Sequence, residues 1–357
     1  MPRTVIQESR TERLEILDME GRLDEALAPA LSDDQLVTLY RLMVRMRKFD
    51  EKALNLQRQG RIGTYGSIKG QEACQAGLVP ALTRHDWLVP SFREHGVLIS
   101  SGIPMHLVYA LWKGDERSNL FPEGIRCLPP SIPVGSQLLH AAGLGMGLAK
   151  KGDPGVAVGF GGDGATSEGD FHEALNFAGV FSARTLFFIQ NNQWAISVPL
   201  KRQTASETIA QKAHAYGFPG IQVDGNDVLA VTSASQEALA HVRAGRGPYL
   251  IECLTYRMEN HTTADDQSRY RTPEEVAYWA SRDPIDRMRK FLSGRGLWGE
   301  ELEKSWALEV STEVDREVEL LETMPAAPAT DILDYMYGER PWFLEEQRRL
   351  LQEEAES

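Results

Sequence analysis

The sequence predicts an α/β protein in which a mostly parallel sheet lies between two layers of helices, with helical segments at both termini. Between about residues 60 and 255, short apolar segments alternate with amphipathic helical segments. Such alternation favours right-handed βαβ units, and therefore a parallel sheet covered on both faces. Beyond residue 272 the strand pattern stops and the chain is helical in character. Hydrophobic residues make up 42% and charged residues 25% of the 357 residues, as is typical of globular proteins.

Residues 1–45 are expected to form an N-terminal extension and a first helix. Ser32, followed by Asp33 and Asp34, is a typical helix start, because short polar side chains cap the first amides and acidic ones favour the first turn. Apolar residues then repeat at helical spacing, namely Leu36, Leu39, Leu42, Met43 and Met46.

Residues 46–271 are expected to form the α/β domain, and residues 272–357 a C-terminal helical segment. Buried strands are predicted from short apolar runs at 155–160, 185–190, 220–225 and 249–256. Helices are predicted from the longer stretches between them, at 170–179 and 227–245.

Composition excludes several classes of protein. The 38 basic and 51 acidic residues give a net charge of −13, which is opposite to that of a duplex DNA binder. No run approaches the ~18 apolar residues of a membrane span, and the charged N-terminus lacks the apolar core of a secretory signal. Cys74, Cys127 and Cys253 are far apart in the sequence and form no metal or disulfide pattern. We expect a cytoplasmic protein with neither nucleic-acid nor membrane partners.

Polar side chains follow two of the predicted strands. Asp163 ends the strand that closes in GGDG, and Asn192 ends the next strand in NN. Because both strands finish at the same edge of a parallel sheet, these side chains should meet beside the N-terminus of the intervening helix. Ser167, three residues before Asp170, resembles a capping box at that helix start. A carboxylate, an amide oxygen and glycine amides predict a magnesium-bridged diphosphate.

Other interpretations of these residues remain open at this point. GGDG alone is also a common strand-ending turn. A non-catalytic nucleotide- or metal-binding regulatory module would use the same sheet edge, since a fold does not imply a function. A magnesium-dependent phosphohydrolase would use Asp163 as its nucleophile.

A wider pattern resembles a known family. GDG, followed by 26 residues and NN, matches the thiamine diphosphate signature. The stretches GDGATSEGDFHEALNFAG and QNNQWAIS resemble the alpha subunits of thiamine diphosphate-dependent 2-oxo acid dehydrogenases, as do RQGRIGTYGSIKGQEA, VPSFREHG and YRMENHTTADDQSRYR. The resemblance covers roughly residues 35–345 and implies the thiamine diphosphate-binding form of the three-layer fold.

The resemblance implies a role for each of ten residues. It assigns magnesium to the side chains of Asp163 and Asn192 and the main-chain carbonyl of Trp194, and the diphosphate to the amides of Gly164 and Ala165. It further assigns Arg93 to the diphosphate, Phe92 to the cofactor's flank, and Ile132 and Val134 to the pocket around its rings.

The tenth residue, His261, is implied to be catalytic and to lie beside the cofactor, on a loop just past the last predicted strand. An imidazole suits proton donation or electrostatic stabilisation because its unperturbed pKa is near neutrality. We expect Arg269 to order this loop by pairing with Asp265 or Asp266, although exposed pairs contribute only ~0–1 kcal/mol.

By this resemblance the chain is the alpha subunit of a 2-oxo acid dehydrogenase, an oxidoreductase that decarboxylates its substrate and passes the acyl group to the lipoyl domain of a dihydrolipoyl acyltransferase. Because the chain has room for only one sheet domain, a separate beta subunit is expected in an α2β2 heterotetramer. The segment NLFPEGIRCLPPSIPVGSQ favours the bacterial pyruvate branch. GDGATSEGD and HTTADDQSRYR also fit the branched-chain 2-oxo acid (3-methyl-2-oxobutanoate) branch, and acetoin cleavage is a further alternative.

Overall fold

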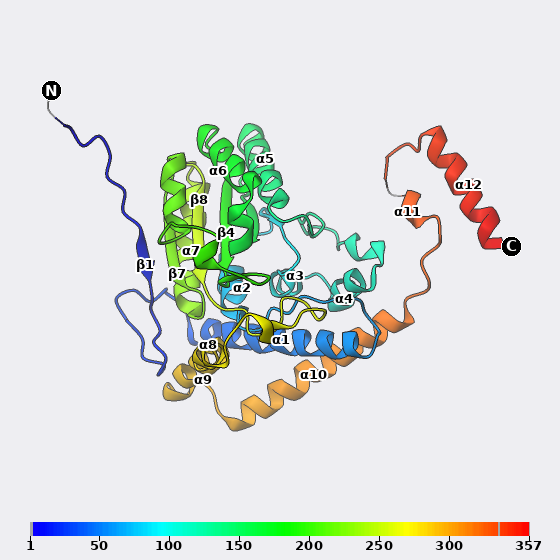
Figure 1. The fold of residues 1–357 in the computed structure, drawn as a ribbon. Coiled ribbons are helices and arrows are strands. Elements are labelled where there is room, and N and C mark those ends of the chain that lie inside the picture. Colours follow the sequence, from blue (N-terminus) through cyan, green and yellow to red (C-terminus); the bar gives the residue numbers. More distant parts are fainter. Residues whose placement is uncertain (1–2, 335, 357) are drawn as a thin grey trace.

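The computed structural model describes residues 3–334 and 336–356, and a six-stranded parallel sheet lies at its centre (Figure 1). The strand order is β1-β7-β8-β4-β3-β2, and every neighbouring pair is parallel. The strands are β1 (Glu12–Leu14), β2 (Trp87–Val89), β3 (Ala157–Gly162), β4 (Thr185–Asn191), β7 (Gly220–Asp224) and β8 (Tyr249–Leu254). A separate two-stranded antiparallel ribbon joins β5 (Trp194–Ala195) to β6 (Val198–Pro199). All four predicted strands are confirmed, within two residues at each end.

Helices cover both faces of the sheet. The α-helices of the α/β region are α1 (Asp33–Arg58), α2 (Glu72–Leu78), α3 (His95–Ser100), α4 (Met105–Lys113), α5 (Ser136–Lys151), α6 (Gly169–Val180) and α7 (Val228–Arg243). Short 3-10 helices are η1 (Val79–Ala81), η2 (Glu116–Asn119), η3 (Asp163–Ser167), η4 (Leu200–Arg202), η5 (Ala210–Tyr216) and η6 (Gln267–Arg269).

The central strand β4 shows why the sheet is buried on both sides. Its side chains alternate in direction, so that Leu186 and Phe188 belong to one apolar cluster and Phe187 and Ile189 to the other. A strand with two covered faces reads as a continuous apolar run, which is why TLFFIQ was recognisable in the sequence.

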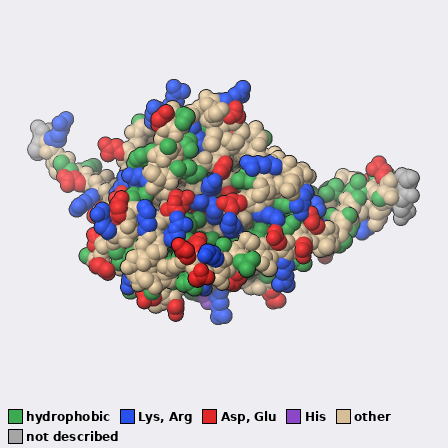
Figure 2. Space-filling view, turned by 90° about the horizontal axis from the view of Figure 1, so that it is seen from below, with side chains coloured by type: hydrophobic (Ala, Val, Ile, Leu, Met, Phe, Trp, Pro, Cys, Tyr) green, Lys and Arg blue, Asp and Glu red, His purple; other side chains and the backbone are tan. Residues whose placement is uncertain are grey.

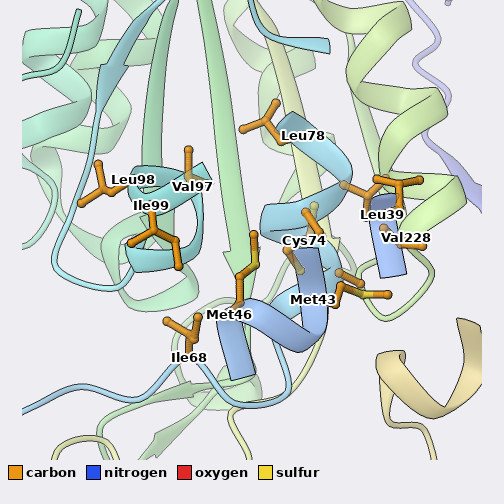
Figure 3. Packing of buried hydrophobic residues seen from close by; sticks show 14 of the residues in the cluster. Leu39, Met43, Met46, Ile68, Cys74, Leu78, Val97, Leu98, Ile99 and Val228 are labelled. Carbon is orange, nitrogen blue, oxygen red and sulfur yellow. The ribbon is translucent and has the colours of Figure 1, made fainter. Parts of the chain in front are cut away.

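Each face has its own packing. On one face, α5 and α6 lie side by side over β3 and β4, and a Cβ on Gly159 of β3 would come within 2.6 Å of the Ala141 Cβ of α5. On the other, α1, α2 and α7 form a larger core. Figure 3 shows Met43 of α1 beside Cys74 of α2, with Val228 of α7 nearby.

The first helix begins as expected but ends later. Ser32 is its N-cap, and Ser32 and Gln35 form a reciprocal capping box. The helix then continues to Arg58, across the expected division between residues 45 and 46. Its length places Tyr40 and Phe49 fully in the core, so the helix is part of the α/β body.

Two strands of the six-stranded sheet were not expected from the sequence, β1 and β2, and neither was the β5–β6 ribbon. Each of β1 and β2 has only three residues in register with its neighbour, and β1 (ERL) is mostly polar and exposed, so neither has a strand-like hydrophobic pattern. The N-terminal extension therefore contains a strand. The Asp227 carboxylate accepts hydrogen bonds from the amides of Ile16 and Leu17 and also caps α7, which ties the extension to the sheet.

The segment after residue 272 is helical, as predicted. It contains α8 (Pro273–Ala280), α9 (Pro284–Gly294), α10 (Glu300–Thr323), α11 (Asp331–Asp334) and α12 (Trp342–Glu356). The last two helices stand away from the body on an arm (Figure 1). Seen from below, acidic and basic side chains are intermixed over the face of α1 and α10 (Figure 2). No helix in the described part of the chain is both long and apolar enough to cross a membrane.

The expected capping box before α6 is wrong. The N-cap is Glu168, without a side-chain cap, and the Ser167 hydroxyl instead lies 3.5 Å from the Gln203 carbonyl. The reason is that a 3-10 turn, η3, occupies residues 163–167 and turns Ser167 outward.

Candidate active site

A cavity of about 460 Å³ opens at the carboxyl edge of the sheet, where β3 and β4 end. All ten residues singled out from the sequence line it: Phe92, Arg93, Ile132, Val134, Asp163, Gly164, Ala165, Asn192, Trp194 and His261. They come from five separate stretches of the chain. The sheet topology therefore brings residues that are far apart in the sequence into one cavity.

Three oxygen-bearing groups meet at one end of this cavity. One terminal atom of the Asn192 amide lies 3.3 Å from Asp163 Oδ1 and 3.2 Å from the main-chain carbonyl oxygen of Trp194. With the NH₂ group turned inward, the amide donates to both oxygens; with its oxygen turned inward, three oxygens face one another. The second arrangement is the donor set of a hard cation such as Mg²⁺. The residues present therefore fit a magnesium ion.

The three candidate ligands include a single carboxylate, that of Asp163. Among the described residues, no group of three or more His, Cys, Asp or Glu side chains is arranged to hold a metal. Burial raises the pKa of Asp163 to about 6, while a hydrogen bond from Gln203 acts in the opposite direction. Such a sparse donor set suits an ion that takes its remaining ligands from phosphate oxygens and water.

A tight turn after β4 orients the main-chain carbonyl of Trp194 toward the Asn192 side chain. Gln193 and Ile196 have φ values of 71° and 55°, in the left-handed region that a β-branched residue such as Ile rarely adopts. The Trp194 indole donates to Glu275 at 2.8 Å, which fixes the ring against α8. Strain of this kind persists only where its surroundings enforce it, and it commonly accompanies a functional site.

Gly164, the second glycine of the GDG turn, permits a close approach between this turn and the β5–β6 ribbon. A Cβ on Gly164 would come within 2.9 Å of the Ala195 Cβ, so a larger residue would push the turn and the β5 ribbon apart. The first amides of the 3-10 turn that begins at Asp163 have no partner within that turn. The amide of Gly164, which precedes the first i to i−3 bond of the turn, is thus suited to an anionic group such as a diphosphate, and the amide of Ala165 follows it in the chain.

Arg93 and Phe92 form another wall. Arg93 is buried and donates to the carbonyl oxygens of Ser67 and His261. Burial and the nearby Arg257 lower the pKa of Arg93 to about 10, so it keeps its positive charge at neutral pH. The Phe92 ring meets the His261 ring edge to face at 5.9 Å. At the mouth of the cavity, Ile132 and Val134 are 59% and 46% exposed.

His261 lies in the cavity, as expected, and its pKa is far from that of a free imidazole. Burial and the positive charges of Arg93 and Arg257 lower the pKa of His261 to about 3. Its Nδ1 lies 3.2 Å from Arg257 and 3.4 Å from Arg93. This pKa lies well below the unperturbed value of 6.5, so the imidazole is neutral at physiological pH. A neutral imidazole can donate or accept a hydrogen bond but carries no charge.

The loop that carries His261 is held by contacts that the sequence did not predict. Asp265 accepts hydrogen bonds from the His261 amide, at 2.8 Å, and from the Tyr270 hydroxyl. Arg257 donates to Tyr270 and to the carbonyls of Trp194 and Ile196. Arg257 thereby joins the loop to the candidate metal site, a link between positions 63 residues apart that no local pattern reveals.

Arg269 has a smaller role than these residues. It pairs with Asp266, one of the two expected partners, but at 4.0 Å and with 82% of its side chain exposed. Arg271, like Arg257, is a buried cation of this loop, and it donates to the carbonyls of Arg257 and Glu259. The pairing of Arg269 is confirmed, whereas the ordering of the loop comes mainly from buried groups.

Further polar groups line the cavity without a signal in the sequence. Glu94 is buried, accepts a hydrogen bond from Gln190 at 2.9 Å, and has its pKa raised to about 7 by desolvation. Gln71 contacts Asn192 at 3.2 Å, and Glu168 and Trp112 also line the wall. In the sequence, the glutamate of the Arg-Glu-His run looks like an ordinary surface charge, and only the fold shows that it is buried.

Comparison with known proteins agrees with this geometry. The family model described as "Dehydrogenase E1 component" matches residues 40–330. The chain belongs to the dehydrogenase E1 component family. It is 42% identical over 348 residues, 97% of this chain and 94% of the relative, to the pyruvate dehydrogenase E1 component subunit alpha of Staphylococcus epidermidis, and equally to that of Staphylococcus aureus. It is also 51% identical over 274 residues to the 3-methyl-2-oxobutanoate dehydrogenase subunit alpha of Mycobacterium tuberculosis, which covers 77% of this chain and 75% of that one.

Membership in the E1 family identifies the chain as part of a dehydrogenase and implies thiamine diphosphate as its cofactor. The resemblance drawn from the sequence is confirmed over nearly its whole extent. A purely regulatory module and a phosphohydrolase both fit this E1 chain less well than an oxidoreductase does.

Proposed function

We propose that this E1 chain is the alpha subunit of a 2-oxo acid dehydrogenase that decarboxylates pyruvate oxidatively and delivers the acetyl group to the lipoyl domain of a dihydrolipoyl acyltransferase. Magnesium is part of the proposal, with Asp163, Asn192 and the Trp194 carbonyl as its ligands. The observation that carries it is the convergence of these three groups at the edge of a parallel sheet, where the Asn192 amide lies 3.3 Å from the Asp163 carboxylate and 3.2 Å from the Trp194 carbonyl oxygen.

The chain's own residues have separate tasks in this proposal. Asp163 and Asn192 hold the cation, and the amides of Gly164 and Ala165 bind the anionic end of the cofactor. Arg93 adds positive charge at a buried position, where charge interactions are stronger than in bulk water. When bound, thiamine diphosphate supplies the electron sink for loss of carbon dioxide.

His261 acts at the reacting end of the cavity. Its neutral imidazole, held between Arg93 and Arg257, offers a hydrogen bond without adding a further cation. Preorganised groups of this kind stabilise charge that develops during a reaction. Loss of the ring should therefore affect turnover more than cofactor binding.

A beta subunit is the proposed partner, in an α2β2 heterotetramer. The cavity opens between exposed apolar side chains, Ile132 and Val134 at 59% and 46%, with Ile196 beside them at 54%. Exposed apolar rims around a cavity are typical of surfaces that a partner covers. A second subunit over this mouth would exclude water from the reaction.

Branched-chain 2-oxo acids form a second candidate substrate class. The specific observation is the 51% identity to the mycobacterial 3-methyl-2-oxobutanoate dehydrogenase subunit alpha, although over a shorter stretch than the 42% identity to the pyruvate enzymes. The two acids differ in the size of one side chain, so the volume of the assembled cavity selects between them.

Turnover of the purified component tests the proposal. The tagged chain is recovered with its native partner, and dye reduction is followed with thiamine diphosphate and magnesium present. Pyruvate, 3-methyl-2-oxobutanoate and acetoin are compared at equal concentrations. We expect cofactor-dependent reduction that is fastest with pyruvate. A preference for 3-methyl-2-oxobutanoate would move the chain to the branched-chain class, and no reduction with any of the three would contradict the proposal.

A further inference from the structure

Gln203 reaches the candidate metal site from a segment that the motif does not include. It follows η4, 40 residues after Asp163, and its Nε2 donates to Asp163 Oδ2 at 2.6 Å. The same nitrogen donates to the Val198 carbonyl at 3.0 Å. The main-chain N–H of Gln203 donates to the Leu200 carbonyl at 2.9 Å. The side chain is therefore fixed by its own loop while it touches the carboxylate.

The two oxygens of Asp163 consequently face different groups. Oδ2 accepts from Gln203, whereas Oδ1 faces Asn192 at 3.3 Å, on the side of the Trp194 carbonyl. We propose that Gln203 is a positioning residue, which holds Oδ2 so that Oδ1 is presented to the metal ion. The proposal rests on the proposed function, because it presumes that Asp163 binds magnesium.

The other end of the Gln203 amide supports this assignment. Its Oε1 is buried and, among the described residues, has no hydrogen-bond partner. A buried acceptor left without a donor is costly, so such a group calls for an explanation. Magnesium usually keeps several bound waters, which are strong donors. An unpaired amide oxygen beside the metal-binding carboxylate suits that chemistry.

The backbone of the turn is held by other residues. The Thr166 hydroxyl donates to the Asp163 carbonyl at 2.9 Å, and Lys212 Nζ donates to the Thr166 carbonyl at 3.1 Å. Loss of the Gln203 amide would therefore free the orientation of one carboxylate and leave the turn in place. This separation makes the positioning role testable apart from folding.

The test compares Gln203→Met with Gln211→Met in the assembled component. Gln211 lies in the same segment, bonds only to Thr208 among the described residues, and does not touch Asp163. Calorimetry gives the magnesium concentration for half-saturation at saturating thiamine diphosphate, and thermal melting without ligand reports on folding. Groups that orient metal ligands typically contribute 10–100-fold in affinity, so we expect a rise of ~10–100-fold for Gln203→Met and none for Gln211→Met.

Each outcome has a distinct meaning. A half-saturation value for Gln203→Met within about twofold of the control would overturn the positioning role, on the scale expected for such groups. A lower melting temperature of the unliganded Gln203→Met variant, relative to Gln211→Met, would show a structural role and also overturn it. If the wild-type component bound no magnesium with thiamine diphosphate, the proposed function itself would fail.

Discussion

The two sides of the candidate active site are built by different means. Asp163 and Asn192 follow β3 and β4, central strands whose residues are almost all buried and hydrogen-bonded to neighbours on both sides. His261 lies on the irregular segment between β8 and α8, held by side-chain bonds among Arg257, Asp265 and Tyr270. One side of the site is fixed by the sheet and the other by a charged network.

This contrast bears on function. The rigid side is suited to holding an ion and a diphosphate in fixed geometry, because sites on strands are more precise than sites on loops. The loop side depends largely on side-chain hydrogen bonds, so it can be loosened by substitutions that leave the strands of the sheet unchanged. Substitutions on the rigid side should therefore mainly impair cofactor binding, whereas substitutions on the loop side should mainly impair turnover.

The largest effect is expected on the rigid side. Asp163→Ala removes the only carboxylate among the three candidate ligands and should abolish magnesium-dependent binding of thiamine diphosphate. Asp163→Asn keeps the shape of the side chain and isolates the loss of charge. Both are followed by calorimetry. Normal cofactor binding by Asp163→Ala would show that the metal ligands lie elsewhere.

A smaller and different effect is expected on the loop side. His261→Ala should retain cofactor binding but lose ~10²–10⁴-fold in acyl transfer to lipoamide, the range for a positioned catalytic side chain. Binding is measured by calorimetry and transfer by lipoamide acylation in the same preparation. A loss of cofactor binding equal to that of Asp163→Ala would remove the distinction between the two sides.

The network that holds the loop gives the next prediction. Arg257→Met leaves the carbonyls of Trp194 and Ile196 without their donor, and buried unsatisfied groups cost ~1–3 kcal/mol each. We expect faster limited proteolysis between residues 257 and 271 and weaker magnesium binding. Arg269→Met is the matched control, because its side chain is 82% exposed, and it should behave as the wild type. Equal cleavage of both variants would count against the network.

The pH dependence of magnesium binding should report on the rigid side alone. The pKa of Asp163 is raised from 3.8 to about 6, so its carboxyl takes up a proton as the pH falls through about 6. Because a protonated carboxyl is a poor ligand, half-saturating magnesium should rise about tenfold per pH unit below that value. His261, with its pKa lowered to about 3, stays neutral over this range. A flat profile from pH 7 to 5 would contradict the assignment.

The same contrast explains what the sequence could predict. The strands of the rigid side are continuous apolar runs, and their polar ends stand out, so Asp163 and Asn192 were found from pattern alone. Arg257 and Gln203 have no such pattern, because their roles depend on contacts with residues 63 and 40 positions away. The lowered pKa of His261 likewise depends on two arginines that only the fold brings together.

The strand β1 has a consequence for the order of folding. Its neighbour β7 begins only at Gly220. The amide of Ile16 donates to the carboxylate of Asp227, which is synthesised 211 residues later. At ~5–20 residues per second, ribosomal synthesis leaves the N-terminal segment unpaired for roughly 10–40 s. A polar segment such as Glu12–Leu14 tolerates that delay, whereas an apolar strand in the same place would be exposed to aggregation throughout. Of the two edge strands, β1 and β2, β1 is thus synthesised first, although its partner strand is synthesised later than that of β2.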